Sequence, residues 1–215
     1  MKSRGAVTLV FDDGYREVYN LVLPLLARYG VHAVFAVPLN PIDGKISGHA
    51  VASVQDWQKA AKKGGHELAA HGISHTSLVS LSPTELAKEL QEPQKFLSAT
   101  TIIYPGGAHN DEVVSLANNY YTAGRTVLYG LETLPPKDPM RLHTINFTKR
   151  NFSVVRANIH ALRAFLQNKW LIETYHFVDD KPSDLMHSTM LSDLETHLDF
   201  ITSLPIRIGT IKELL

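Results

Sequence analysis

The chain has 215 residues, of which 44% are hydrophobic, so it is long enough to bury one sizeable core. Its 21 Lys and Arg residues balance its 21 Asp and Glu residues, which argues against a nucleic-acid partner, because such partners usually require a basic surface. The absence of cysteine excludes disulfides, thiolate-metal sites and a cysteine nucleophile. A neutral glycan or a small neutral molecule suits this surface better.

The chain shows no long apolar run, so we expect no membrane span. Met1 to Gly5 leads directly into a strand-like segment, and no signal peptide is visible there. The compartment stays open, because a signal could have been removed and chains without cysteine occur both inside and outside cells. With no repeat or linker visible, we expect one domain over residues 1–215.

Short apolar runs alternate with segments of helical periodicity in the first half of the chain. In chain order we expect a strand at Ala6–Phe11, a helix at Val18–Tyr29, a strand at Val31–Val37, a helix from Ser53 to Lys63 and a strand at His66–Ala70. Gly30 and Gly64-Gly65 are stop signals for these helices. Ser53 with Asp56 resembles a capping box, and Ser82-Pro83-Thr84-Glu85 is a stronger helix start.

The second half continues the same alternation. We expect a strand at Thr101–Tyr104, a helix at Asp111–Asn119, strands at Tyr121–Val127 and Leu142–Phe147, a helix at Ser153–Gln167, a strand at Trp170–Phe177, a helix at Leu191–Ser203 and a short strand at Ile206–Ile208. In the helix at Ser153–Gln167, roughly one face carries Val154, Ile159, Leu162 and Leu166. This alternation predicts a parallel sheet, and about seven strand-helix units in one domain favour an α/β barrel.

Two polar clusters follow expected strands, where a parallel barrel has its active site. Asp12 and Asp13 end the first strand, and adjacent side chains point different ways, so one could bind a metal while the other faces a substrate. His71 and His75 follow the third strand, and on a helical turn both imidazoles could reach one cation, with a carboxylate completing the set. The structural alternatives are an Asp-Gly turn and loop histidines bonded to the backbone.

Two further features follow later strands. Tyr104-Pro105-Gly106-Gly107 is typical of an ordinary turn, and it could also aim a backbone N–H at an oxyanion. His176 ends the seventh strand and is either a satisfied core histidine or a general acid that works near neutral pH.

Together and in this order, the clusters resemble the polysaccharide deacetylases of carbohydrate esterase family 4, also called the NodB homology domain. Phe11-Asp12-Asp13-Gly14 matches most of the motif T-F-D-D-G, and His71 and His75 match H-[ST]-x-x-H. Tyr104-Pro105-Gly106-Gly107 matches the end of R-P-P-Y-G, and His176 matches the histidine of the fifth motif. The similarity covers nearly the whole chain.

The resemblance implies a distorted (β/α)₇ barrel and a metal-dependent hydrolase that removes N-acetyl groups from an amino-sugar glycan. It implies that Asp13, His71 and His75 bind a divalent ion. Zinc is the expected ion, and such a site also accepts cobalt, nickel or manganese. The implied partner is an N-acetylated oligosaccharide or polysaccharide, and the oligomeric state stays open.

The resemblance also implies roles in catalysis. Asp12 would be the general base, and His176 would protonate the departing amine. The N–H of Gly106 would bind the oxyanion, with Tyr104 and Pro105 beside it at the substrate.

Parts of the family pattern are missing. The arginine of the third motif aligns with Ile103, and we expect Arg125, at the end of the fifth strand, to pair with Asp12 instead; a surface or interface arginine is the alternative. The fourth motif, with its Asp and Trp, is not recognisable, so the partner of His176 is unassigned. Thr174 occupies the region of the leucine that lines the acetyl pocket.

Two rival functions remain. A relative in the same superfamily could cleave a small cyclic or linear amide, although retention of the three metal-site residues argues against a metal-free version. A catalytically silent glycan-binding relative would keep the barrel without the chemistry. Retention of both Asp12 and His176 argues against it, because binding alone does not require that pair.

Overall fold

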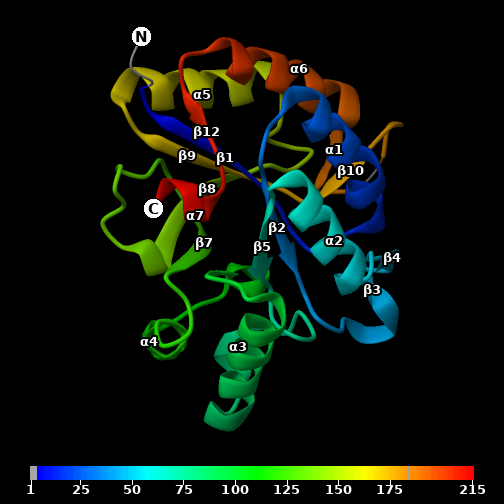
Figure 1. Cartoon of the computed structure of the whole chain (residues 1–215), viewed down its shortest axis with the longest axis vertical. Coiled ribbons are helices and arrows are strands. Elements are labelled where there is room, and N and C mark those ends of the chain that lie inside the picture. The colour runs from blue at the N-terminus through cyan, green and yellow to red at the C-terminus, as the bar shows by residue number, and fades with distance from the viewer. Residues whose placement is uncertain (1–3, 184) are drawn as a thin grey trace.

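The structure, a computed structural model, describes residues 4–183 and 185–215 and shows a parallel barrel with helices on its outside (Figure 1). The strands of the barrel are, in order, β1 (Ala6–Phe11), β2 (Val34–Val37), β5 (Glu67–Ala70), β6 (Thr101–Ile103), β7 (Ala123–Tyr129), β8 (Leu142–Asn146) and β9 (Trp170–Tyr175). Pairing of β9 with β1 closes the barrel, which confirms the expected (β/α)₇ architecture. The single domain expected over residues 1–215 stays a prediction, and residues 1–3 and 184 of it lie outside the described residues.

The last strand, β12 (Arg207–Ile208), completes the amino end of the barrel. It pairs with the start of β1, whereas β2 pairs only with the end of β1, at Val10 and Phe11. The sequence predicted a longer β2 that begins at Val31. The strand begins later because the Val31 N–H donates to the Leu26 carbonyl at 3.1 Å and so belongs to the end of the preceding helix.

The helices are α1 (Arg16–Tyr29), α2 (Val54–Gly64), α3 (Pro83–Leu97), α4 (Asp111–Ala117), α5 (Val154–Gln167), α6 (Leu191–Ser203) and α7 (Ile211–Leu214). Most begin and end close to the residues expected, but only the start of α3 was predicted and the short α7 was not expected. Ser82 and Glu85 form the predicted capping box, and the hydroxyl of Ser53 accepts the N–H of Asp56. Gly30 and Gly65 end their helices in the left-handed conformation. None of the helices described here combines the length and apolar character that a membrane crossing requires.

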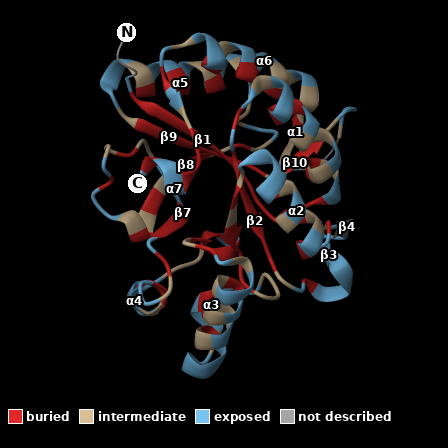
Figure 2. Ribbon diagram, in the orientation of Figure 1, coloured by how far each residue is buried: buried red, intermediate tan, exposed pale blue. Residues whose placement is uncertain are grey.

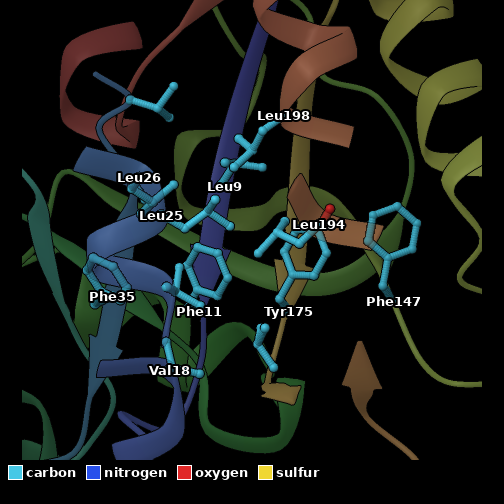
Figure 3. Close-up of a cluster of buried hydrophobic side chains, with 14 of the residues drawn as sticks. Leu9, Phe11, Val18, Leu25, Leu26, Phe35, Phe147, Tyr175, Leu194 and Leu198 are labelled. Atoms are coloured by element: carbon cyan, nitrogen blue, oxygen red, sulfur yellow. The ribbon is translucent and has the colours of Figure 1, made fainter. Parts of the chain in front are cut away.

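Apolar side chains fill both faces of the strands, because successive residues of a strand point to opposite sides. Val10 and Ile172 belong to the cluster inside the barrel, which α7 joins at the amino end through Ile211. Leu9 and Phe11 belong to the outer cluster and pack against α1 and α6 (Figure 3). The strands are accordingly buried throughout most of their length, and exposed residues gather on the outer faces of the helices (Figure 2).

Two small additions stand at the carboxyl end of the barrel, and neither was expected from the sequence. One is the antiparallel pair β3 (Lys45–Ile46) and β4 (His49–Ala50). The other is β10 (Phe177–Asp179), which pairs in parallel with β11 (Ser188–Met190). The strand predicted to run to Phe177 is therefore divided at His176, because the Phe177 N–H pairs with the His187 carbonyl outside the barrel.

Helix α5 packs against the barrel through a different face from the one its apolar residues indicated. Its buried residues are Ala157, His160, Ala161 and Ala164. Ile159, Leu162 and Leu166 are instead exposed to 50%, 39% and 56%. Small alanine side chains allow the helix to approach the strands closely, so the larger residues point outward.

Candidate active site

Side chains from the carboxyl ends of five strands meet at one cleft of about 430 Å³. Asp12 follows β1, His71 follows β5, Tyr104 follows β6, Arg125 lies in β7 and His176 follows β9. The strands run parallel, so their carboxyl ends meet at the same end of the barrel. Asp13, His75 and Gly106 also line the cleft, whereas Pro105 is buried and does not.

Asp13, His71 and His75 converge, although 58 residues separate Asp13 from His71. One carboxylate oxygen of Asp13 lies 3.2 Å from Nε2 of His71 and 3.1 Å from Nε2 of His75. One ligand atom from each of the three residues lies within 4.8 Å of the other two. Such a cluster has the dimensions of a site for a single ion.

The two histidines are brought together by a loop, not by the helical turn that their spacing suggested. Gly72 and His75 both have positive φ, at 73° and 64°, which a helix does not allow. Glu89 of α3 accepts hydrogen bonds from the Ile73 N–H and the Ser74 hydroxyl. Position 72 favours glycine because its φ of 73° is strained for a residue with a side chain, and a Cβ there would also lie 2.8 Å from the Glu89 carboxylate.

The donor set fits a divalent cation. His71 Nδ1 lies 2.7 Å from the Ile103 carbonyl, which can only accept, so Nδ1 carries the proton in the neutral ring. The lone pair of Nε2 then faces the Asp13 carboxylate. Two electron-rich atoms at this distance repel each other unless a proton or a cation lies between them. Imidazole nitrogen with carboxylate oxygen is also a common ligand set for zinc and its neighbours in the periodic table.

The electrostatics of the cluster favour ionised forms. Burial acts to raise the pKa of Asp13, but its contacts with the His71 and His75 rings, which are favourable when those rings are protonated, outweigh burial and hold that pKa well below its usual value. Burial acts to lower the pKa of His75, but the Asp13 carboxylate outweighs it and raises that pKa. The backbone of Asp13 itself has a φ of 71°, a left-handed conformation that is strained for a residue with a side chain.

Arg125 and Asp12 form a buried ion pair. Nη2 of Arg125 lies 2.6 Å from each carboxylate oxygen of Asp12, and both side chains are at most 5% exposed. The contact expected from the sequence is therefore present. Its geometric origin is the sheet register, in which Arg125 pairs with Ile103 on the neighbouring strand. Arg125 thus projects from the same level of the barrel as the residue that aligns with the family arginine.

His176 also lies beside Asp12. Its Nε2 is 3.6 Å from the second Asp12 oxygen. Burial lowers the pKa of His176, because it outweighs the opposite effect of Asp12. The lowered pKa favours the neutral ring at pH 7. Within the described part of the chain, Nδ1 of His176 is buried and has no hydrogen-bond partner.

The loop between β10 and β11 brings a second imidazole to His176. The rings of His176 and His187 lie 4.6 Å apart between centroids, and both line the cleft. Sequence reasoning missed His187, because no motif marks it and only the pairing of β10 with β11 brings it here. Asn146 was also missed, although its place at the end of β8 was a usable signal.

In the turn after β6, Tyr104, Gly106 and Gly107 have different roles. The Tyr104 hydroxyl donates to the Met140 carbonyl at 3.0 Å, so Tyr104 is held by the protein. The Gly107 N–H donates to the Tyr104 carbonyl at 2.8 Å and closes the turn. Gly106 is exposed at the cleft with a φ of 62°, and its N–H is the candidate for contact with a substrate oxygen.

Comparison with known proteins agrees with the motifs. The sequence model of the family described as "Polysaccharide deacetylase" matches residues 2–123. YxkH of Bacillus subtilis (strain 168), provisionally named a polysaccharide deacetylase, is 32% identical over 122 residues. That match includes 54% of this chain and 42% of YxkH, so it spans less than half of that relative.

Solved structures share the fold at low sequence identity. The chitin deacetylase of the fungal pathogen Colletotrichum lindemuthianum superposes with a TM-score of 0.67 at 16% identity, covering 100% of this chain and 88% of that one. BA3943 of Bacillus anthracis, described as a pseudoenzyme of carbohydrate esterase family 4, gives a TM-score of 0.66 at 16% identity, covering 100% of this chain and 66% of that one. Because the fold occurs in both, activity has to be argued from the residues of the site.

Proposed function

Because this chain belongs to the polysaccharide deacetylase family, we propose that it is a metal-dependent hydrolase that removes N-acetyl groups from an amino-sugar glycan. The observation that carries the proposal is the convergence of Asp13, His71 and His75 beside the Asp12–Arg125 pair in one cleft. A glycan-binding surface alone would require neither a cation-binding set nor a buried carboxylate next to it.

Asp13, His71 and His75 are the proposed ligands of the ion. When bound, a divalent ion supplies Lewis-acid polarisation of an amide carbonyl and makes water more acidic. Zinc suits two imidazoles and a carboxylate, and cobalt, nickel or manganese would also be accepted.

Asp12 is the proposed general base. In hydrolysis, water adds to the amide carbon, and its proton moves to a carboxylate oxygen of Asp12. Arg125 holds that carboxylate through Nη2, which contacts both oxygens, and balances its charge, so the base keeps one orientation. General acid–base assistance of this kind contributes about 10²–10⁴-fold to rate.

His176 is the proposed acid. The C–N bond breaks only if the nitrogen gains a proton, because an unprotonated amine anion is a poor leaving group. The proton that Asp12 takes from water can pass to His176 Nε2, 3.6 Å away, and from there to the nitrogen. Since burial lowers the pKa of His176, the protonated ring releases its proton readily. The Gly106 N–H is the proposed donor to the developing oxyanion.

The test is acetate release from a panel of N-acetylated oligosaccharides of increasing length, assayed with and without a chelator. Release that a chelator abolishes and added zinc restores is the expected result. Small linear and cyclic amides in the same panel address the rival amidohydrolase function. Tight oligosaccharide binding without acetate release from any substrate, at full metal occupancy, would instead favour a silent glycan-binding protein.

A further inference from the structure

The outward face of α5 carries a continuous apolar ridge. Its members are Val155, Ile159, Leu162 and Leu166, exposed to 69%, 50%, 39% and 56%. They follow one another at intervals of four, three and four residues, so they form a single line along the helix. We call this line the α5 ridge. The helix lies on the outside of the barrel beside α6 (Figures 1 and 2).

The ridge is not explained by packing within the chain. The opposite face of α5 already fills its place against the barrel with Ala157, His160, Ala161 and Ala164. An outer helix of a globular protein normally presents polar residues to water on this side. Contiguous exposed apolar residues usually mark a surface that contacts something else.

The charged residues of α5 have one sign. Helix α5, VVRANIHALRAFLQ, contains Arg156 and Arg163 and no acidic residue. Among the described residues, neither guanidinium lies within ion-pair distance of a carboxylate. Arg4 adds a third cation at the end of the helix, where it donates to the Leu166 carbonyl at 3.1 Å. The chain as a whole is neutral, so this concentration of charge is local.

A second copy of the chain fits the ridge poorly. A standard protein interface uses about 20–30 residues from each partner, and a single row of four is far smaller. If two copies packed their ridges antiparallel, Arg156 of one helix would lie beside Arg163 of the other, and like charges would repel. The small size of the ridge and its arginines both suit a surface that carries negative charges on its outside and an apolar layer below them.

We propose that the α5 ridge docks this protein on an anionic lipid surface. The four apolar side chains would enter the boundary between headgroups and acyl chains, and Arg156 and Arg163 would contact lipid phosphates. The cleft opens at the end of the barrel and α5 lies along its side, so docking leaves the cleft accessible. Docking through the ridge does not require the proposed deacetylase activity.

Co-sedimentation with lipid vesicles tests the proposal. The probes are vesicles of phosphatidylcholine alone and vesicles that also contain phosphatidylglycerol, each at low and high salt. We expect binding to the anionic vesicles only, with weakening at high salt because salt screens the contacts between arginine and phosphate.

Two double variants separate the contributions. Ile159→Ser with Leu162→Ser should weaken vesicle binding by about tenfold or more by removing apolar insertion, and Arg156→Gln with Arg163→Gln should remove the preference for anionic lipid. Ile42→Ser is the matched control, since Ile42 is an apolar residue exposed to 75% in a different element. Thermal unfolding and acetate release from a soluble oligosaccharide should be unchanged in all variants.

Equal binding to neutral and anionic vesicles, or full binding by both double variants, would overturn the proposal. So would a stable dimer in lipid-free solution that the Ile159→Ser, Leu162→Ser variant dissociates, because that outcome assigns the ridge to a second copy of the chain.

Discussion

Strand β9 separates two buried polar clusters that differ in one respect. On its outer side, Glu173 contacts His197 Nε2 through both oxygens, at 3.1 and 3.0 Å, and accepts the Tyr175 hydroxyl at 3.0 Å. His197 Nδ1 lies 2.7 Å from Asn158 Oδ1, which completes the network. At the mouth of the barrel, the cluster around Asp12 and Asp13 borders a cleft instead.

The two clusters differ in how many of their polar side-chain atoms have a hydrogen-bond partner within the protein. Glu173 and His197 are fully buried, and their polar side-chain atoms have partners within the protein. In the cleft cluster, Nε of Arg125 and Nδ1 of both His176 and His187 have no partner among the described residues. A polar cluster whose atoms all have partners within the protein stabilises the fold. A cluster whose polar atoms lack partners beside a cleft is available to bind a substrate or an ion.

The largest effect is expected where the cation is held. Asp13→Ala removes the carboxylate that both imidazoles face, so stoichiometric zinc binding and acetate release should both disappear. His75→Ala should do the same. Elemental analysis of the purified variants measures the metal, and circular dichroism shows that they are folded. Full metal occupancy in either variant would refute the ligand assignment.

Asp12→Asn should separate catalysis from metal binding. The amide keeps the shape of the side chain but is a far weaker base, so we expect a rate loss of about 10²–10⁴-fold at unchanged metal content. Steady-state kinetics of acetate release measure the loss. Wild-type turnover in this variant would exclude Asp12 as the base.

The outer cluster should respond in stability instead of activity. His197→Leu leaves the Glu173 carboxylate buried without its main partner, and we expect a loss of about 3–5 kcal/mol in unfolding free energy. Activity per folded molecule should remain. A double Glu173→Leu, His197→Leu variant is the control and should recover much of the stability. A stable but inactive His197→Leu protein would contradict the division between the two clusters.

His176→Ala should affect substrates unequally. An amide needs a proton on its leaving nitrogen, whereas an activated ester does not, so amide hydrolysis should slow about 10-fold or more beyond the ester. His187→Phe is the comparison variant, because it keeps an aromatic ring beside His176 and removes the two ring nitrogens of His187. Equal losses on both substrates in His176→Ala would argue against the acid role.

The smallest effect is expected at His66, which lies at the opposite end of β5 from His71. Burial, reinforced by nearby His32, lowers the pKa of His66 to about 4, and its Nδ1 accepts the Ala33 N–H. Below about pH 6.5 the unfolded chain binds a proton there that the folded chain does not, so stability should fall as pH drops toward 4. His66→Gln should flatten this dependence, as measured by urea unfolding at several pH values. An unchanged slope would assign the acid sensitivity to other groups.

Local patterns in the chain were sufficient for most of the fold. The helix start at Ser82 and the stops at Gly30 and Gly65 were predictable, because capping hydrogen bonds and left-handed glycines involve residues only a few positions apart. The barrel strands were found for the same reason, with ends displaced by a few residues. Asp12, Asp13, His71 and His176 were recognisable because each follows an apolar strand.

Only tertiary structure decided which of these groups touch. Pairing of β6 with β7 sets Arg125 beside Ile103, pairing of β10 with β11 brings His187 to His176, and the Glu89 contact shapes the loop of His71 and His75. The exposure of the α5 ridge could not be predicted from the sequence either, because the helical period shows that a face is apolar but not whether the barrel covers it. The physical reason is range: propensity and capping act within a few residues, whereas strand register and packing depend on the whole closed sheet.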